Sequence, residues 1–136
     1  MNELVRHQLD ILLKDVKRVV IKIGTRVIDN EQTHFNRPVM ESLAAEIAGL
    51  RSKGIEVLIV SSGAVGAGIR ALGVKGRPTS IHLRQAYAAV GQGRLMSLYT
   101  ELFGHYNLIP AQVLLTRTDL DRRQSYLNAN ETLQHL

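Results

Sequence analysis

Two short, nearly all-apolar segments constrain the fold of this chain more than any other feature of its sequence. Residues 18–23 (RVVIKI) and 56–60 (EVLIV) are rich in β-branched residues, which is typical of strands buried in a parallel sheet. Apolar residues recur at spacings of three and four over residues 39–50, which predicts a helix that Pro38 begins and Gly54 ends. This order of strand, helix and strand predicts a parallel α/β unit.

The remaining segments extend this alternation. Residues 110–115 (PAQVLL) predict a third strand. The predicted fold is therefore an α/β three-layer αβα sandwich with a mainly parallel sheet, and a sheet of only three strands predicts that this domain is incomplete. Residues 24–37 are polar and are expected to form a loop. Further helices are expected over residues 2–15, from about 64 to Leu72, from a cap at Thr79 or Ser80 to about Phe103, and over residues 121–136.

The long helix that ends near Phe103 carries two glycines that its apolar pattern does not explain. Gly91 and Gly93 each cost a helix about 1 kcal/mol relative to alanine, so we expect another element to pack closely against them. The expected core stripe of this helix is Leu83, Tyr87, Val90, Leu98 and Leu102.

Positive charge is distributed unevenly along the chain. The 136 residues have a formal net charge of +5, and no carboxylate lies between Glu56 and Glu101. Either this segment forms a basic surface whose charge is balanced by acidic residues elsewhere in the chain, or it binds the phosphate of a small ligand or of nucleic acid. Aromatic residues make up only 4% of the chain, which argues against a protein that stacks single-stranded bases. The basic residues of the segment are Arg70, Lys75, Arg77, Arg84 and Arg94.

Other residue types restrict the class of protein further. The chain has no cysteine, which excludes disulfides, thiolate metal sites and thiol catalysis. Its five histidines are scattered without the spacing of metal ligands, so no metal site is expected. No apolar run approaches the roughly 18 to 20 residues that cross a membrane. Glu3 and Asp10 interrupt the N-terminal apolar pattern, unlike a secretion signal, and we therefore expect a cytoplasmic protein.

Two segments that follow predicted strands are candidates for ligand binding, because parallel sheets bind ligands beyond the carboxyl ends of their strands. In the first, Lys22 precedes Gly24 and Thr25, an arrangement that can place an ammonium beside a phosphate. A lysine whose stem covers apolar surface is the alternative. In the second, residues 61–68 (SSGAVGAG) pass from a strand into a helix. Exposed N–H groups there favour an anion, although glycines also serve tight turns and helix packing.

Five ordered blocks of the sequence resemble one family. They are VVIKIGT, EVLIVSSGAVGAG, RQAYAAVGQGRLMSLYTELF, AQVLLTRTD and YLNANETL, and they are similar to those of the glutamate 5-kinases within the amino acid kinase family. The resemblance implies phosphorylation of the side-chain carboxylate of L-glutamate by ATP with Mg²⁺, the first step of proline biosynthesis. It also implies feedback inhibition by proline and a homo-oligomer in the full-length protein. The residues themselves argue against a membrane or a nucleic acid as partner.

The resemblance also assigns roles to individual residues. It implies that Lys22 is catalytic and contacts the transferred phosphoryl group, with Gly24 and Thr25 in the same nucleotide-binding segment. It implies that Ser62, together with Gly63 and Ala64, binds glutamate. Arg26 departs from the family pattern, since many members have a small hydroxyl residue there.

Residues 1–17 precede the resemblance and are expected to form an N-terminal helical extension. The resemblance implies that residues 18–136 form the N-terminal, substrate-side half of an amino acid kinase domain. The family's adenine pocket and further catalytic groups belong to the other half, so the 136-residue chain alone is expected to be inactive. The alternative is a stand-alone, non-catalytic α/β module that binds glutamate or phosphate, and a nucleic-acid binder is a third candidate that rests on charge alone.

Overall fold

The computed structural model describes residues 7, 11, 14–28, 35–76 and 78–136. Most of the helix expected over residues 2–15, and with it most of the expected extension over 1–17, lies outside the described residues. No helix in the part of the chain that the structure describes is both long and apolar enough to cross a membrane.

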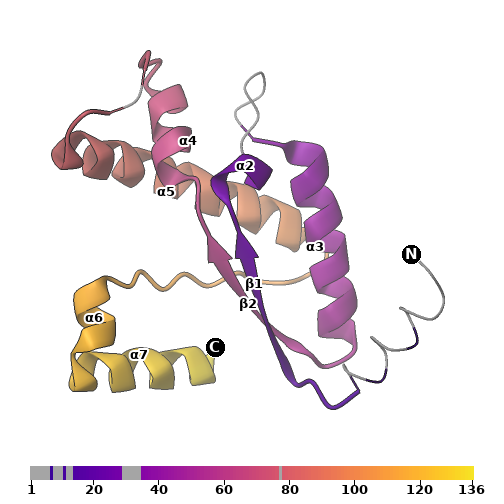
Figure 1. Ribbon diagram of the computed structural model, residues 1–136. Coiled ribbons are helices and arrows are strands. Elements are labelled where there is room, and N and C mark those ends of the chain that lie inside the picture. Colours follow the sequence, from indigo (N-terminus) through magenta and orange to yellow (C-terminus); the bar gives the residue numbers. More distant parts are fainter. Residues whose placement is uncertain (1–6, 8–10, 12–13, 29–34, 77) are drawn as a thin grey trace.

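Two parallel strands form the centre of the molecule (Figure 1). Strand β1 (Arg18–Ile23) pairs in register with β2 (Glu56–Ser61), so that Ile23 lies opposite Ser61 at their carboxyl ends. Both strand predictions and the parallel pairing are confirmed. The crossover between the strands is the predicted helix, α3 (Arg37–Ser52), which has proline in its first turn.

The end of α3 explains why glycine follows this helix. The N–H of Ile55 donates to the carbonyl of Leu50 at 3.1 Å, and the N–H of Gly54 donates to that of Arg51 at 3.0 Å. This pair of bonds is a Schellman motif, which needs a left-handed residue just beyond the helix. Gly54 has a φ of +76°, a conformation that glycine adopts without steric cost.

The loop expected over residues 24–37 is partly wrong. Thr25–Ile28 form one turn of helix, α2, and Ile28 is buried in the core. Ile28 is held there by tertiary packing, and Phe35 at the other end of the segment also packs against the core. The overall polarity of the segment does not reveal this packing.

The third predicted strand is also wrong. Residues 110–115 are irregular and have no strand partner among the described residues. Leu114 is 73% exposed and Leu115 is 43% exposed. The segment therefore has neither the strand pairing nor the burial of an interior strand. Beyond it, α7 (Arg123–His135) confirms the helix expected over 121–136, and the short helix α6 (Arg117–Asp121) that precedes it was not expected.

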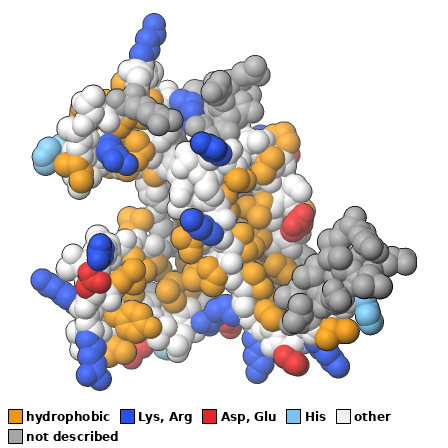
Figure 2. Space-filling model, viewed as in Figure 1, with side chains coloured by type: hydrophobic (Ala, Val, Ile, Leu, Met, Phe, Trp, Pro, Cys, Tyr) orange, Lys and Arg blue, Asp and Glu red, His pale blue; other side chains and the backbone are white. Residues whose placement is uncertain are grey.

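The hydrophobic core lies on one face of the sheet, between the strands, α3 and α5 (Ile81–Gly104). Strand residues alternate between faces, and Ile21, Ile23 and Ile59 point into this core. On the other face, Val20 is 61% exposed and Val60 is 50% exposed. Figure 2 shows hydrophobic side chains gathered over the region where the strands lie. The α/β class is confirmed, with helices packed on one face of the sheet in the described part.

The core stripe expected for α5 is only partly correct. Leu98 and Leu102 are buried, whereas Leu83 and Val90 are exposed. Leu83 and Val90 lie in the N-terminal half of the helix, whose one buried residue is Gly91. The buried residues of α5 are Gly91, Leu95, Leu98, Tyr99, Leu102 and Phe103.

The backbone of α5 touches that of α4 (Ala64–Ala71), as Gly91 predicted. A Cβ atom on Gly91 would overlap the carbonyl oxygen of Ala64, and one on Gly68 would overlap that of Tyr87. The close packing expected at Gly91 is therefore confirmed. The same expectation is wrong for Gly93, where an added Cβ would meet nothing within 4 Å.

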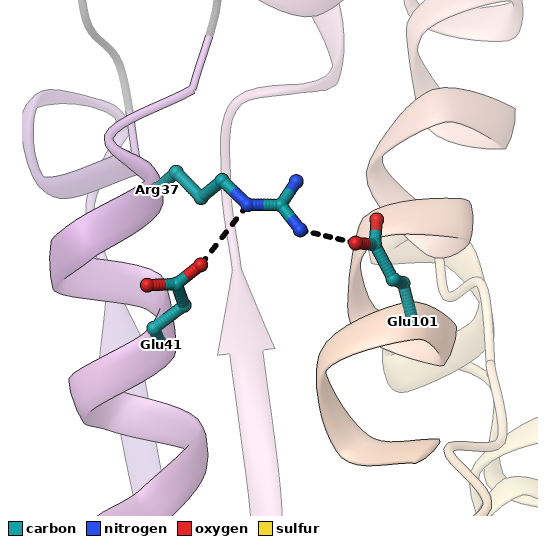
Figure 3. Close-up of polar contacts among 3 residues, drawn as sticks. All are labelled: Arg37, Glu41 and Glu101. Atoms are coloured by element: carbon teal, nitrogen blue, oxygen red, sulfur yellow. Dashed lines mark hydrogen bonds and ion pairs between the residues drawn. The ribbon is translucent and has the colours of Figure 1, made fainter. Parts of the chain in front are cut away.

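An ion-pair network joins α3 to α5 at the surface (Figure 3). The guanidinium of Arg37 donates to Glu41 at 3.0 Å and also to Glu101. The hydrogen bond from Arg37 lowers the pKa of the Glu101 carboxyl below its usual value. All three side chains are about half exposed, so solvent screens the pairs and their role is to orient the two helices.

Candidate functional site

The two candidate segments leave the same edge of the sheet. Ile23 and Ser61 are paired residues at the carboxyl ends of β1 and β2. One residue further, the N–H of Ser62 donates to the carbonyl of Ile23 at 3.0 Å. This bond ties the glycine-rich segment directly to the end of β1.

The glycine-rich segment begins α4 with an unusual cap. Gly63 is the N-cap residue with a φ of +111°, which a residue with a Cβ rarely adopts. The N–H of Ala67 donates to the carbonyl of Gly63 at 2.9 Å and so closes the first turn. The N–H groups of residues 64–66 precede that bond and have no partner within the helix. They form the positive end of its dipole.

A pocket of about 320 Å³ lies at this helix end. It brings together the three residues predicted to bind substrate and one of those predicted to bind nucleotide. None of the described residues that line it is acidic. Its lining residues are Thr25, Ser61, Ser62, Gly63, Ala64, Val65, Gly66 and Arg84.

Lys22 and Gly24 lie beside this pocket but do not line it. Lys22 is opposite Val60 in the sheet, and it is exposed where its neighbour Ile23 is buried. Because successive strand residues point to opposite faces, the ammonium of Lys22 lies on the open face of the sheet. A ligand that reaches from the pocket across the strand ends towards this open face would come near Lys22.

A buried tyrosine supports the floor of the site. The hydroxyl of Tyr99 is 2.8 Å from Oγ of Ser61, and its ring stacks on Phe103 with centroids 5.9 Å apart. Burial raises the pKa of the Tyr99 phenol, so the group stays protonated and keeps this hydrogen bond at neutral pH. The bond fixes the last residue of β2 immediately before the loop.

Sequence reasoning missed Arg84 and Tyr99 as parts of this site. Arg84 belongs to the acid-free segment, but four other basic residues share that signal. Tyr99 lies between two residues of the aliphatic pattern and resembles ordinary core. Their places become clear only when α5 packs along α4 and the strand ends.

A larger, more open hollow of about 460 Å³ lies along the end of α7. Its lining residues come from that helix and the chain end alone, so groups from different elements do not converge there. It does not have the form of a binding site. The residues are Asn128, Glu131, Thr132, His135 and Leu136.

Comparison with known proteins agrees with the sequence blocks. The profile of the amino acid kinase family matches residues 17–136. The chain is 53% identical over 125 residues to a glutamate 5-kinase of Geobacter metallireducens and 46% identical over 125 residues to one of Pelobacter propionicus, covering 92% of this chain and 34% of each relative. It is 44% identical over 119 residues to one of Caldanaerobacter subterraneus, covering 88% of this chain and 32% of that relative. The chain thus spans about a third of the length of these relatives.

Proposed function

We propose, because the chain belongs to the amino acid kinase family, that it forms the substrate-side part of a glutamate 5-kinase. The complete protein would transfer the terminal phosphoryl group of ATP to the side-chain carboxylate of L-glutamate. The observation that carries this proposal is the pocket at the strand ends, where helix N–H groups and Arg84 lie together and no described lining residue is acidic. Proline as feedback inhibitor, a homo-oligomer and a cytoplasmic location belong to the same proposal.

In this proposal the segment after β2 binds glutamate and the segment at the end of β1 contacts ATP. The hydroxyl of Ser62 and the backbone of Gly63 and Ala64 hold glutamate inside the pocket. Lys22 and Gly24, beside the pocket, face the phosphates of ATP. Thr25 lines the pocket and follows Gly24, so it lies where the two substrates would meet.

The chemistry needs no general base from these residues. A glutamate side chain has a solution pKa of about 4.3, so it is an ionised nucleophile at neutral pH. One carboxylate oxygen forms a bond to the terminal phosphorus while the bond from that phosphorus to the bridging oxygen breaks, and ADP leaves with the electron pair. The protein positions the two groups and stabilises charge on the phosphoryl oxygens.

Such a reaction uses Mg²⁺, and the described residues contain no cluster that would hold a metal ion by itself. Among them, no group of three or more His, Cys, Asp or Glu residues lies close enough to hold a metal ion. Mg²⁺ is commonly held by substrate phosphates with one or two carboxylates. The steps proposed for these residues therefore do not involve it.

Replacing Ser62 with alanine is expected to raise the KM for glutamate about tenfold while changing kcat little. The hydroxyl would contact a substrate group that is present in both the ground state and the transition state, so its loss weakens binding throughout the reaction. Coupled measurement of ADP release by the complete protein, with glutamate varied, tests this. Ser97→Ala is the matched control, because Ser97 bonds to the carbonyl of Gly93 outside the pocket. A wild-type protein without glutamate-dependent ADP release would refute the proposed function.

The 136-residue polypeptide by itself is expected to release no ADP in the same assay. Its described residues contain no cluster of three or more potential metal ligands, and Val20 and Val60 remain exposed on one face of the sheet. Light scattering should show self-association through this apolar face. Robust turnover by the isolated polypeptide would contradict the division of the active site, and a stable monomer that binds glutamate would support the non-catalytic module instead.

A further inference from the structure

Arg84 holds a fixed position at the rim of the pocket. Helix α5 begins at Ile81, and the side chain of its N-cap Ser80 accepts a hydrogen bond from the N–H of Leu83 at 3.3 Å. The N–H of Arg84 donates to the carbonyl of Ser80 at 3.1 Å, so the capped first turn sets the backbone of Arg84. Its side chain lines the same pocket as residues 61–66.

The charge of Arg84 is not neutralised within the described part of the chain. Three arginines have carboxylate partners among the described residues: Arg18 with Glu56 at 2.6 Å, Arg37 with Glu41 and Glu101, and Arg117 with Asp121. No ion pair to Arg84 is found among the described residues, and the chain has no carboxylate between Glu56 and Glu101. A guanidinium offers five N–H donors in a planar fork that matches a carboxylate. Among the described residues that line the pocket, Arg84 has the one charged side chain.

Glutamate carries two carboxylates, and they place opposite demands on an arginine. The reacting carboxylate must give electron density to phosphorus, and a bidentate arginine on it would stabilise the ground state more than the transition state. The other carboxylate keeps its charge throughout the reaction, so holding it weakens no nucleophile. Lys22, which is proposed to face the phosphates of ATP, does not line the pocket. Lys22 and Arg84 are therefore separated, as binding of the phosphates and of the second carboxylate requires.

We propose that Arg84 binds the α-carboxylate of the substrate and thereby selects an amino acid whose two acidic groups are both ionised. This inference rests on the proposed function, since it names the group that the same pocket recognises. A guanidinium would also bind a phosphate of ATP, and the experiment distinguishes that phosphate from the α-carboxylate.

The test compares L-glutamate with L-isoglutamine in the complete protein. Isoglutamine keeps the reacting side-chain carboxylate but carries a neutral amide in place of the α-carboxylate. In Arg84→Gln, kcat/KM for glutamate should fall about 10- to 100-fold, mainly through KM, as expected for the loss of a charged hydrogen bond. The inhibition constant of isoglutamine should change less than about threefold. The preference for glutamate is the ratio of the inhibition constant of isoglutamine to the KM for glutamate, and neither constant depends on the folded fraction of the protein.

Two further variants test the position and the chemical group of the arginine. Arg94→Gln removes the same side chain from another exposed position of α5 that does not line the pocket, and the preference for glutamate should not change. Arg84→Lys keeps the charge without the fork, so it should recover part of the preference.

Each outcome decides for or against the assignment. An Arg84→Gln protein that keeps the wild-type preference for glutamate overturns it. A rise in the KM for ATP with equal losses on both amino acids assigns Arg84 to a phosphate instead and also overturns it. A wild-type protein that is inactive on glutamate refutes the proposed function itself, and the α-carboxylate assignment with it.

Discussion

Replacing Gly91 with alanine is expected to lower the free energy of unfolding by about 2 to 3 kcal/mol, as overpacking of a close contact does. The added methyl group would overlap the carbonyl oxygen of Ala64 and lie against the backbone nitrogen of Gly68. Both are backbone atoms of α4, and that helix follows β2 directly through residues 62 and 63. The overlap is therefore relieved only by moving the helices apart. Urea-induced unfolding followed by circular dichroism measures the loss.

Gly93→Ala is the matched control on the same helix. An added Cβ there would meet nothing within 4 Å, so the substitution should stabilise the protein by up to about 1 kcal/mol through helix propensity. Opposite signs for one substitution at two positions of one helix are the distinguishing result. If Gly91→Ala unfolds at the same urea concentration as the wild-type protein, the two helices do not pack through their backbones.

The same contact links stability to binding. The N-terminus of α4 supplies the N–H groups of the pocket, and the close approach to α5 also sets the position of Arg84 on the neighbouring helix. A displaced α4 would change the spacing between these two groups of donors. Weaker glutamate binding should therefore accompany the destabilisation in Gly91→Ala and should be absent in Gly93→Ala.

Local sequence was sufficient to predict the elements that local chemistry determines. The β-branched runs became β1 and β2, and Gly54 ended α3 because only a left-handed residue completes that hydrogen-bond motif. The segment 110–115 has similar apolar character but is not a strand, because a strand also requires a neighbour to pair with. That neighbour is a property of the whole fold and leaves no mark on the segment itself.

The residues of the site likewise differ in whether local sequence could identify them. Residues 61–66 could be identified from sequence, because small residues after a buried strand create exposed N–H groups wherever they occur. Arg84 and Tyr99 reach the site from a different helix, and Ser61 meets Tyr99 across 38 positions of sequence. Their contribution depends on the contact between α4 and α5 at Gly68 and Gly91. No local pattern specifies which helix packs against these glycines.

Lys22→Ala is expected to reduce kcat of the complete protein about 100-fold, on the order of 3 kcal/mol in activation free energy, with a smaller effect on the KM for glutamate. In the proposed reaction, negative charge is redistributed over the phosphoryl oxygens during transfer, and a fixed ammonium stabilises that state more than the bound substrates. Lys22 lies on the strand next to the pocket without lining it, so glutamate binding should be largely preserved. Steady-state ADP release with both substrates varied separates the two effects.

Lys53→Ala is the control for charge alone. Lys53 is exposed like Lys22, but it caps the C-terminal end of α3 just before β2 begins, at the opposite end of the sheet from the pocket. Removing it changes net charge by the same amount, so kcat should stay within about twofold of the wild-type value. Equal kcat values for the wild-type protein and Lys22→Ala would remove this lysine from the mechanism. A rise in the KM for glutamate with unchanged kcat would place its ammonium on the substrate carboxylate rather than on the transferred group, and the division of tasks between Lys22 and Arg84 would then be wrong.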